Sequence, residues 1–166
     1  MEITNEQLLQ LLQEKLEQRP AKSMLKMEIS DFTADAYKQG EFIKVSKKDL
    51  LGKKIGCEIY SVSMDSHFVH KAWHESSDRI NHVEYAMIGD PNGQLTKQFS
   101  LYSPADGMAE RGTIVINPEG KVASYEVVSD NIGRNAEELL RKVEASQFVY
   151  EHGDQVQKPL SRLSIW

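Results

Sequence analysis

The sequence predicts a small α/β domain that contains a parallel sheet. Residues Glu58 to Ser63 are rich in β-branched and aromatic side chains, and a helical pattern follows near Ser66 to Ser76 with almost no loop between them. A second apolar run, Tyr85 to Ile88, comes next. This strand–helix–strand order is typical of a parallel sheet, so we expect both strands to be buried.

The composition limits the classes of function. The 166 residues are enough for one domain, and 40% of them are hydrophobic and 27% charged, as in soluble globular proteins. The net charge of −5 argues against nucleic acid as the main partner. No apolar run approaches the ~20 residues of a membrane span, and the acidic start does not resemble a signal peptide. The single cysteine excludes an intramolecular disulfide and predicts a reducing, cytoplasmic setting.

The first expected element is an amphipathic helix from Thr4 to Gln18, within an N-terminal extension of residues 1–22. Thr4 and Gln7 match a capping box, and Pro20 ends the helical pattern. The apolar stripe consists of Leu8, Leu9, Leu12 and Leu16. A helix this short is marginal alone, so the stripe is expected to pack on the same domain or to dock on a partner subunit.

The main domain is expected to span residues 23–153. It starts with a hairpin whose strands are Phe32 to Tyr37 and Glu41 to Val45, joined at Lys38-Gln-Gly40. A turn at Asp49 to Gly52 separates this hairpin from the strand–helix–strand unit. After that unit we expect a turn at Gly89 to Gly93, a short helix at Leu95 to Phe99 and a loop at Leu101 to Glu110. Two hairpin strands at Gly112 to Ile116 and Val122 to Val128 come next, followed by a long helix from Asn135 to about Tyr150 and a tail at 154–166.

Three histidines are candidates for a metal site. His67, His70 and His74 would project from nearly one face of the predicted helix, and His70 and His74 have the i, i+4 spacing of helical zinc pairs. However, three ligands along one straight helix converge poorly on one ion, and no carboxylate is clearly placed to complete the site. We therefore expect structural or solvent-facing histidines and no metal. No Gly-rich phosphate loop, Ser-His-Asp pattern or Cys-x-x-Cys occurs, so no cofactor is expected.

Cys57 and Arg111 are the other candidate site residues. A reactive cysteine needs a partly exposed, electropositive environment, often at a helix N-terminus, whereas Cys57 opens a predicted strand. The favoured interpretation is a small apolar core residue, and the alternative is a redox thiol. Arg111 follows a loop and precedes a predicted strand, where it is either an anion anchor or a surface charge.

Several motifs resemble the typical 2-Cys peroxiredoxins of the bacterial alkyl hydroperoxide reductase C type. The resemblance covers most of residues 24–153. The motifs that carry it are Tyr60-Ser-Val-Ser63, Asp65-Ser-His-Phe-Val-His-Lys-Ala-Trp-His74, Tyr85-Ala-Met-Ile-Gly-Asp-Pro91, Gly107-Met-Ala-Glu-Arg-Gly-Thr-Ile-Val-Ile-Asn-Pro-Glu-Gly120 and Ile132-Gly-Arg-Asn-Ala-Glu-Glu-Leu-Leu-Arg-Lys-Val143. The resemblance implies a thioredoxin-like fold with a mixed sheet, and thiol-dependent peroxidase chemistry.

The sequence departs from the family pattern at the join Lys54-Ile55. The resemblance implies a strand and a helix there, which carry a Pro-x-x-x-Thr-x-x-Cys motif with the peroxidatic cysteine, yet Gly52 is followed directly by Lys-Lys-Ile-Gly-Cys57. Near the C-terminus, Gln157 or Lys158 stands where the family has its resolving cysteine. Arg111 matches the family arginine that stabilises the thiolate. The central strand of the sheet and its following helix are thus expected to be missing, which leaves a gap with unpaired backbone groups.

These departures imply a peroxiredoxin-like protein with little or no peroxidase activity that acts as an oligomeric or interaction module. The family pairs subunits edge to edge through the strand matching Val122 to Val128, so a homodimer or higher oligomer is expected, with an intact peroxiredoxin as another candidate partner. The alternative is a redox enzyme or peroxide sensor that uses Cys57 or a partner subunit's cysteine. A remnant or engineered derivative without a selected function is a third interpretation.

Overall fold

The computed structural model describes residues 4, 6, 9–10, 23–52 and 56–153 of the chain. Most of the predicted N-terminal helix, the join at Lys54-Ile55 and the tail 154–166 lie outside these residues, so those three predictions stay predictions. Among the helices that are described, none is long and apolar enough to cross a bilayer.

The domain begins with the predicted hairpin. Strands β1 (Thr33–Lys38) and β2 (Glu41–Ser46) pair antiparallel. Gln39 and Gly40 both have positive φ, 45° and 94°, which is the backbone twist that a two-residue hairpin turn requires. The predicted turn that follows contains a single helical turn, α2 (Lys47–Leu50), closed by a capping box between Ser46 and Asp49.

The hairpin extends into a four-stranded mixed sheet in the order β2-β1-β4-β3. Strands β3 (Tyr60–Ser63) and β4 (Ala86–Gly89) pair in parallel, and β4 pairs antiparallel with β1. Helix α3 (His67–Ser76) connects β3 to β4 and is capped by the Ser66 hydroxyl, which accepts from the Val69 amide. The predicted parallel pair and its crossover helix are therefore confirmed.

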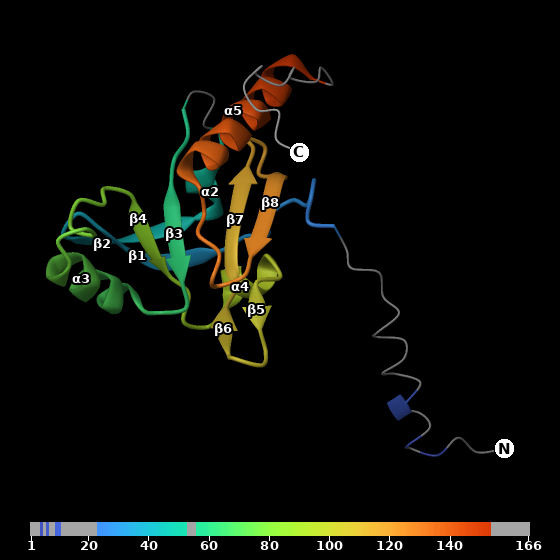
Figure 1. The fold of residues 1–166 in the computed structure, drawn as a ribbon, viewed down its shortest axis with the longest axis horizontal. Coiled ribbons are helices and arrows are strands. Elements are labelled where there is room, and N and C mark those ends of the chain that lie inside the picture. The colour runs from blue at the N-terminus through green and yellow to red at the C-terminus, as the bar shows by residue number, and fades with distance from the viewer. Residues whose placement is uncertain (1–3, 5, 7–8, 11–22, 53–55, 154–166) are drawn as a thin grey trace.

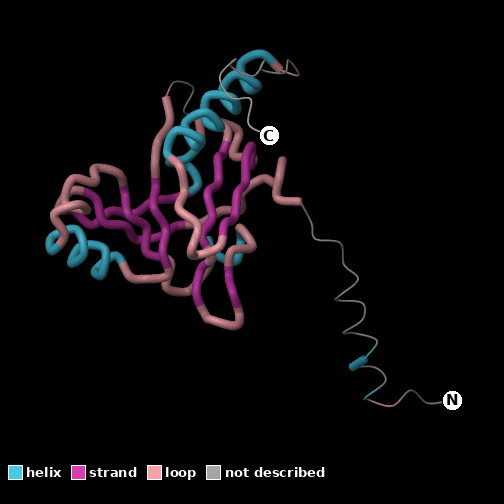
Figure 2. Tube along the Cα trace, in the orientation of Figure 1, coloured by secondary structure: helices cyan, strands magenta, loops and turns pink. Residues whose placement is uncertain are grey.

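The second half of the chain forms a separate two-stranded sheet (Figure 1). Helix α4 (Gln94–Gln98) leads to β7 (Arg111–Ile116) and β8 (Val122–Val128), which pair with each other. The predicted loop before β7 contains a short hairpin, β5 (Tyr102–Ser103) and β6 (Met108–Ala109). Helix α5 (Ala136–His152) contacts β7 and β8, and the Asn135 side chain caps its N-terminus. Helices α3 and α5 lie on different sides of the strands (Figure 2).

The core is unevenly distributed over these elements. Its main cluster comes from the four-stranded sheet and α4, and consists of Phe32, Ala36, Val45, Ala86, Ile88 and Leu95. All four residues of β4 are buried, whereas β3, β7 and the 17-residue α5 contribute no fully buried residue. The half of the molecule around β7 and α5 is thus packed more loosely than the half around β1 and β4.

One expectation about burial is wrong. The predicted buried strand at Glu58 to Ser63 is an edge strand, and Ile59 and Val62 on it are exposed because β3 has a partner on only one side among the described residues. Phe68 and Trp73 of α3 are also exposed, and the helix instead turns His70 toward the sheet.

Contacts around α4 join the two sheets. The Tyr125 hydroxyl of β8 donates to the Phe99 carbonyl oxygen at 2.9 Å. Leu101 lies so close to Gly112 of β7 that a Cβ at residue 112 would come within 2.5 Å of it. At the start of α4, Asp90 is 3% exposed and accepts from the amides of Leu95 (3.2 Å) and Thr96 (2.8 Å) and from the Thr96 hydroxyl (2.8 Å). This buried carboxylate anchors the segment that connects the sheets.

We expect Asp90→Ala to lower the free energy of unfolding by about 2–4 kcal/mol, because it leaves three buried donors without their acceptor. The control is Asn92→Ala, which removes one exposed bond to the Gln94 amide and should cost about 1 kcal/mol or less. Urea unfolding followed by circular dichroism measures both. Equal losses for the two variants would contradict the anchoring role of Asp90.

Candidate functional site

Cys57, the only cysteine of the chain, lies just before β3 and is exposed. The interpretation as a core residue is therefore wrong, because the backbone enters the sheet only at Tyr60 and at an edge. The Cys57 Sγ lies 3.7 Å from the Glu58 carbonyl oxygen. Nearby atoms desolvate the thiol and the Glu58 carboxylate adds a like charge, and both effects raise the pKa of Cys57 above its ordinary value. The environment thus disfavours the thiolate.

Arg111, at the start of β7, faces a carboxylate. Its Nε lies 4.0 Å from Asp130 Oδ1, and both side chains are largely exposed. Exposed pairs of this kind contribute at most about 1 kcal/mol to stability. Within the described residues, no hydrogen bond or ion pair joins Arg111 to Cys57. The structure therefore does not assemble these two candidate residues into one site.

The three histidines of α3 have three different environments. His70 is 3% exposed, and its Nε2 lies 2.7 Å from the Ser63 hydroxyl on β3. Burial lowers the pKa of His70, with hydrogen bonding to the Met87 backbone opposing the shift. His74 Nε2 lies 3.1 Å from the Val83 carbonyl oxygen, and the His67 ring packs on Phe42 and Phe68.

The rings therefore do not converge on a common point. In the part of the chain that the structure describes, no group of three or more His, Cys, Asp or Glu side chains is placed to hold a metal ion. The His70–Ser63 contact instead fastens α3 to the sheet.

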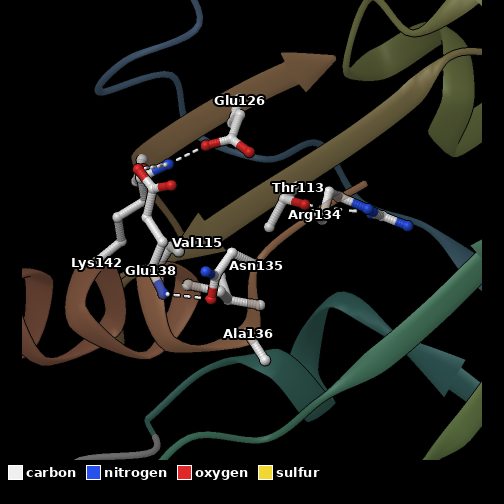
Figure 3. Close-up of a pocket in the computed structure, with 10 residues that line it drawn as sticks. Thr113, Val115, Glu126, Arg134, Asn135, Ala136, Glu138 and Lys142 are labelled. Atoms are coloured by element: carbon white, nitrogen blue, oxygen red, sulfur yellow. Dashed lines mark hydrogen bonds and ion pairs between the residues drawn. The ribbon is translucent and has the colours of Figure 1, made fainter. Parts of the chain in front are cut away.

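A hollow of about 210 Å³ lies between α5 and the β7–β8 sheet (Figure 3). The residues that line it are Thr113, Val115, Ser124, Glu126, Arg134, Asn135, Ala136, Glu138, Leu139 and Lys142. It is smaller than typical ligand pockets of about 300–1,000 Å³.

The polar groups of this hollow bind one another. Lys142 pairs with Glu126 of β8 and with Glu138 at 3.3 Å. Arg134 Nη1 donates to the Gly112 carbonyl oxygen at 3.1 Å. It also donates to the Thr113 hydroxyl at 3.2 Å (Figure 3). These contacts hold α5 and its preceding loop on the β7–β8 sheet. Their role is to stabilise this packing, and they do not form a reactive centre.

Sequence reasoning did not assign roles to these residues. The i, i+4 spacing of Glu138 and Lys142 on a helix is a signal that predicts their pairing. Nothing in the sequence indicates that Glu126 joins them, because this contact depends on how α5 crosses β8.

Comparisons with known proteins place this fold in a family. The model of the AhpC/TSA family matches residues 31–125. Alkyl hydroperoxide reductase C of Salmonella typhimurium is 38% identical over 164 positions that cover 81% of this chain and 88% of the relative. The protein of the same name from Bacillus subtilis is 37% identical over the same shares.

Solved structures agree with the sequence relatives. The crystal structure of Enterococcus faecalis AhpC is 41% identical, with a TM-score of 0.78 over 82% of this chain and 100% of that one. The mitochondrial 2-Cys peroxiredoxin from Plasmodium falciparum, 22% identical with a TM-score of 0.72 over 80% of this chain, supports the fold alone.

The aligned length is also informative. The match to the Salmonella protein spans 164 positions, whereas 81% of 166 residues is about 134, so about 30 aligned positions have no residue in this chain. The predicted α/β, thioredoxin-like fold of the peroxiredoxin type is confirmed, and the chain belongs to the AhpC/TSA family.

Proposed function

We propose that this chain is a peroxiredoxin-like protein of the alkyl hydroperoxide reductase C type that lacks thiol peroxidase activity and acts as an oligomeric or interaction module. The main support for this proposal is that the surroundings of its only thiol favour the protonated form over the thiolate. Peroxide reduction by a cysteine needs a thiolate, which attacks the O–O bond and becomes a sulfenic acid. The raised pKa of Cys57 and the neighbouring Glu58 carboxylate oppose that state.

Three further observations support the absence of the strand–helix unit that would carry a peroxidatic cysteine. About 30 positions of the Salmonella relative have no counterpart here. Strands β3 and β7 belong to separate sheets, and each has one strand partner among the described residues. Arg111, the arginine that the resemblance assigns to thiolate stabilisation, lies beside Asp130.

A redox enzyme or peroxide sensor is the second candidate function. The exposure of Cys57 favours it, since an exposed thiol is accessible to an oxidant or to a partner's cysteine. The two candidates differ in the reactivity that they require of Cys57, and labelling of the thiol separates them.

The interaction role rests on the exposed edge of β8. In the described part of the chain, β8 pairs with β7 on one side only, and Val127 on it is 37% exposed. At its start this edge is occupied, because the Val122 amide donates to the Met27 carbonyl oxygen (2.9 Å) and the Val122 carbonyl oxygen accepts from the Lys26 amide (2.8 Å). The rest of β8, after Val122, has no described strand on its outer side, and an unpaired edge is a template for pairing with a second strand. We assign homodimerisation or higher assembly to Val122–Val128, with an intact peroxiredoxin as a further partner, and the single cysteine supports a cytoplasmic setting.

Peroxide consumption with a thioredoxin- or flavoprotein-type reductant tests the absence of activity. We expect no turnover above the rate without protein, because no activated thiolate is available. An intact alkyl hydroperoxide reductase C assayed in parallel is the positive control. Turnover close to that of the control, abolished by Cys57→Ser, would overturn the proposal.

Alkylation of native Cys57 with iodoacetamide tests the state of the thiol. A pKa above the ordinary 9.0 leaves less than about 1% thiolate at pH 7, so labelling should be slow and should rise roughly tenfold per pH unit up to pH 9. Glu58→Gln removes the like charge, lowers the pKa and should speed labelling at pH 7, whereas Glu41→Gln, on β2, should not. Fast labelling of the unmodified chain at pH 6 would favour the redox candidate.

Sedimentation velocity tests the β8 interface. We expect Val127→Lys to shift the chain from dimers or larger assemblies to monomers at micromolar concentration, because it places a charge on the pairing edge. The matched control is Val62→Lys on the edge of the other sheet, which should keep the assembly. A chain that is monomeric without any substitution, or an assembly that survives Val127→Lys, would contradict this interface.

A further inference from the structure

Strand β3 is an unusual edge. It pairs with β4 in parallel over Tyr60–Ser63, and no other described strand pairs with it. Strands in parallel pairs are normally covered by helices and neighbouring strands. Here Val62 is 45% exposed, Ile59 just before the strand is 56% exposed, and the buried Ser61 hydroxyl has no hydrogen-bond partner among the described residues.

Strand β7 and helix α5 are also incompletely covered by the rest of the described chain. None of the six residues of β7 is fully buried, and its only described strand partner is β8. Helix α5 has no fully buried side chain in 17 residues, and Leu139 and Leu140 are exposed. An α/β domain is stable when each helix buries one apolar face and each inner strand has two neighbours. The loose packing of β3, β7 and α5 therefore indicates surface that lacks a covering segment.

The alignment indicates the size of that segment. About 30 positions of the Salmonella relative have no residue here, and a unit of one strand, one helix and their turns has roughly that length. A strand alone would satisfy the edge of β3 but would leave the apolar face of α5 uncovered. A strand followed by a helix provides both kinds of cover.

We propose that the edge of β3, together with β7 and the exposed face of α5, is an acceptor surface for a strand-and-helix segment of another protein chain. The segment that fits has an uncharged strand rich in β-branched residues, because both of its faces become covered, and an amphipathic helix. This inference rests on the absent strand–helix unit of the proposed function and names a binding surface distinct from the β8 edge.

Strand addition explains how such a segment would be recognised. Main-chain hydrogen bonds to the β3 edge supply affinity, and side chains that pack beside Val62 and Leu140 supply specificity. The incoming segment loses conformational freedom on binding, so part of the interaction free energy is spent on ordering it.

The probe is a synthetic peptide with the residues of Salmonella typhimurium alkyl hydroperoxide reductase C that lack a counterpart in this chain, with any cysteine replaced by serine. A peptide with the same residues in scrambled order is the control. We expect saturable binding by isothermal titration calorimetry and slower hydrogen exchange of the amides in Tyr60–Ser63. Exchange within β1 and β4 should remain unchanged, because those strands are already paired on both sides.

Two variants of the full chain locate the surface. Val62→Lys should weaken peptide binding roughly tenfold or more, since it places a charge on the acceptor edge. Phe42→Lys is the matched control, because Phe42 is 48% exposed on β2, at the opposite edge of the same sheet, and it should leave binding unchanged. Circular dichroism verifies that both variants fold.

Three results would overturn the inference. The first is equal binding of the scrambled peptide, and the second is unchanged peptide binding by Val62→Lys. The third is that, in the free chain, the β3 amides exchange as slowly as the β4 amides, which would mean that the chain covers the β3 edge itself. Each of these can occur while the chain still assembles through β8 and shows no peroxidase activity. The acceptor surface and the proposed function are therefore tested separately.

Discussion

The rest of this structure depends on the pairing of strand edges. Every backbone amide and carbonyl in a sheet needs a partner, and the described strands divide into a well-paired group and a poorly paired one. Strands β1 and β4 have neighbours on both sides and are the most buried strands. Strands β3, β7 and β8 each have a single neighbour, and their side chains are more exposed. The distribution of the core follows from this pairing.

The two sheets share no described strand ladder, and they are held together by side-chain contacts and by backbone hydrogen bonds such as those from Ile29 to Gly120 (2.9 Å) and from Gly52 to Pro118 (3.0 Å). Asp90 anchors the start of α4, Tyr125 reaches the end of α4 from β8, and Leu101 fills the space above Gly112. On the other side, Arg134 and Lys142 fasten α5 and its preceding loop to the β7–β8 sheet. The resulting arrangement is similar to that of Enterococcus faecalis AhpC, with a TM-score of 0.78, although no described strand ladder runs through both sheets.

Chemistry and packing lead to the same view of function. A thiol becomes a nucleophile where positive charge stabilises the thiolate. Here the Glu58 carboxylate raises the pKa of Cys57, and Arg111 lies beside Asp130. Val62 and Leu140 expose apolar surface. Both features support the proposed role in binding another chain.

The sequence by itself determined most of the elements and the family. Local signals were sufficient for the hairpin of β1 and β2 and for the positions of helices α3 and α5, because turn and capping residues act within a few positions. Burial could not be predicted from such local signals. The β-branched residues of Glu58 to Ser63 predicted a buried strand, and only the tertiary structure shows that β3 is an edge, since burial depends on neighbours far along the chain. The same reason explains Cys57, whose apolar character predicted a core position, whereas it is exposed and precedes a strand with a single described strand partner.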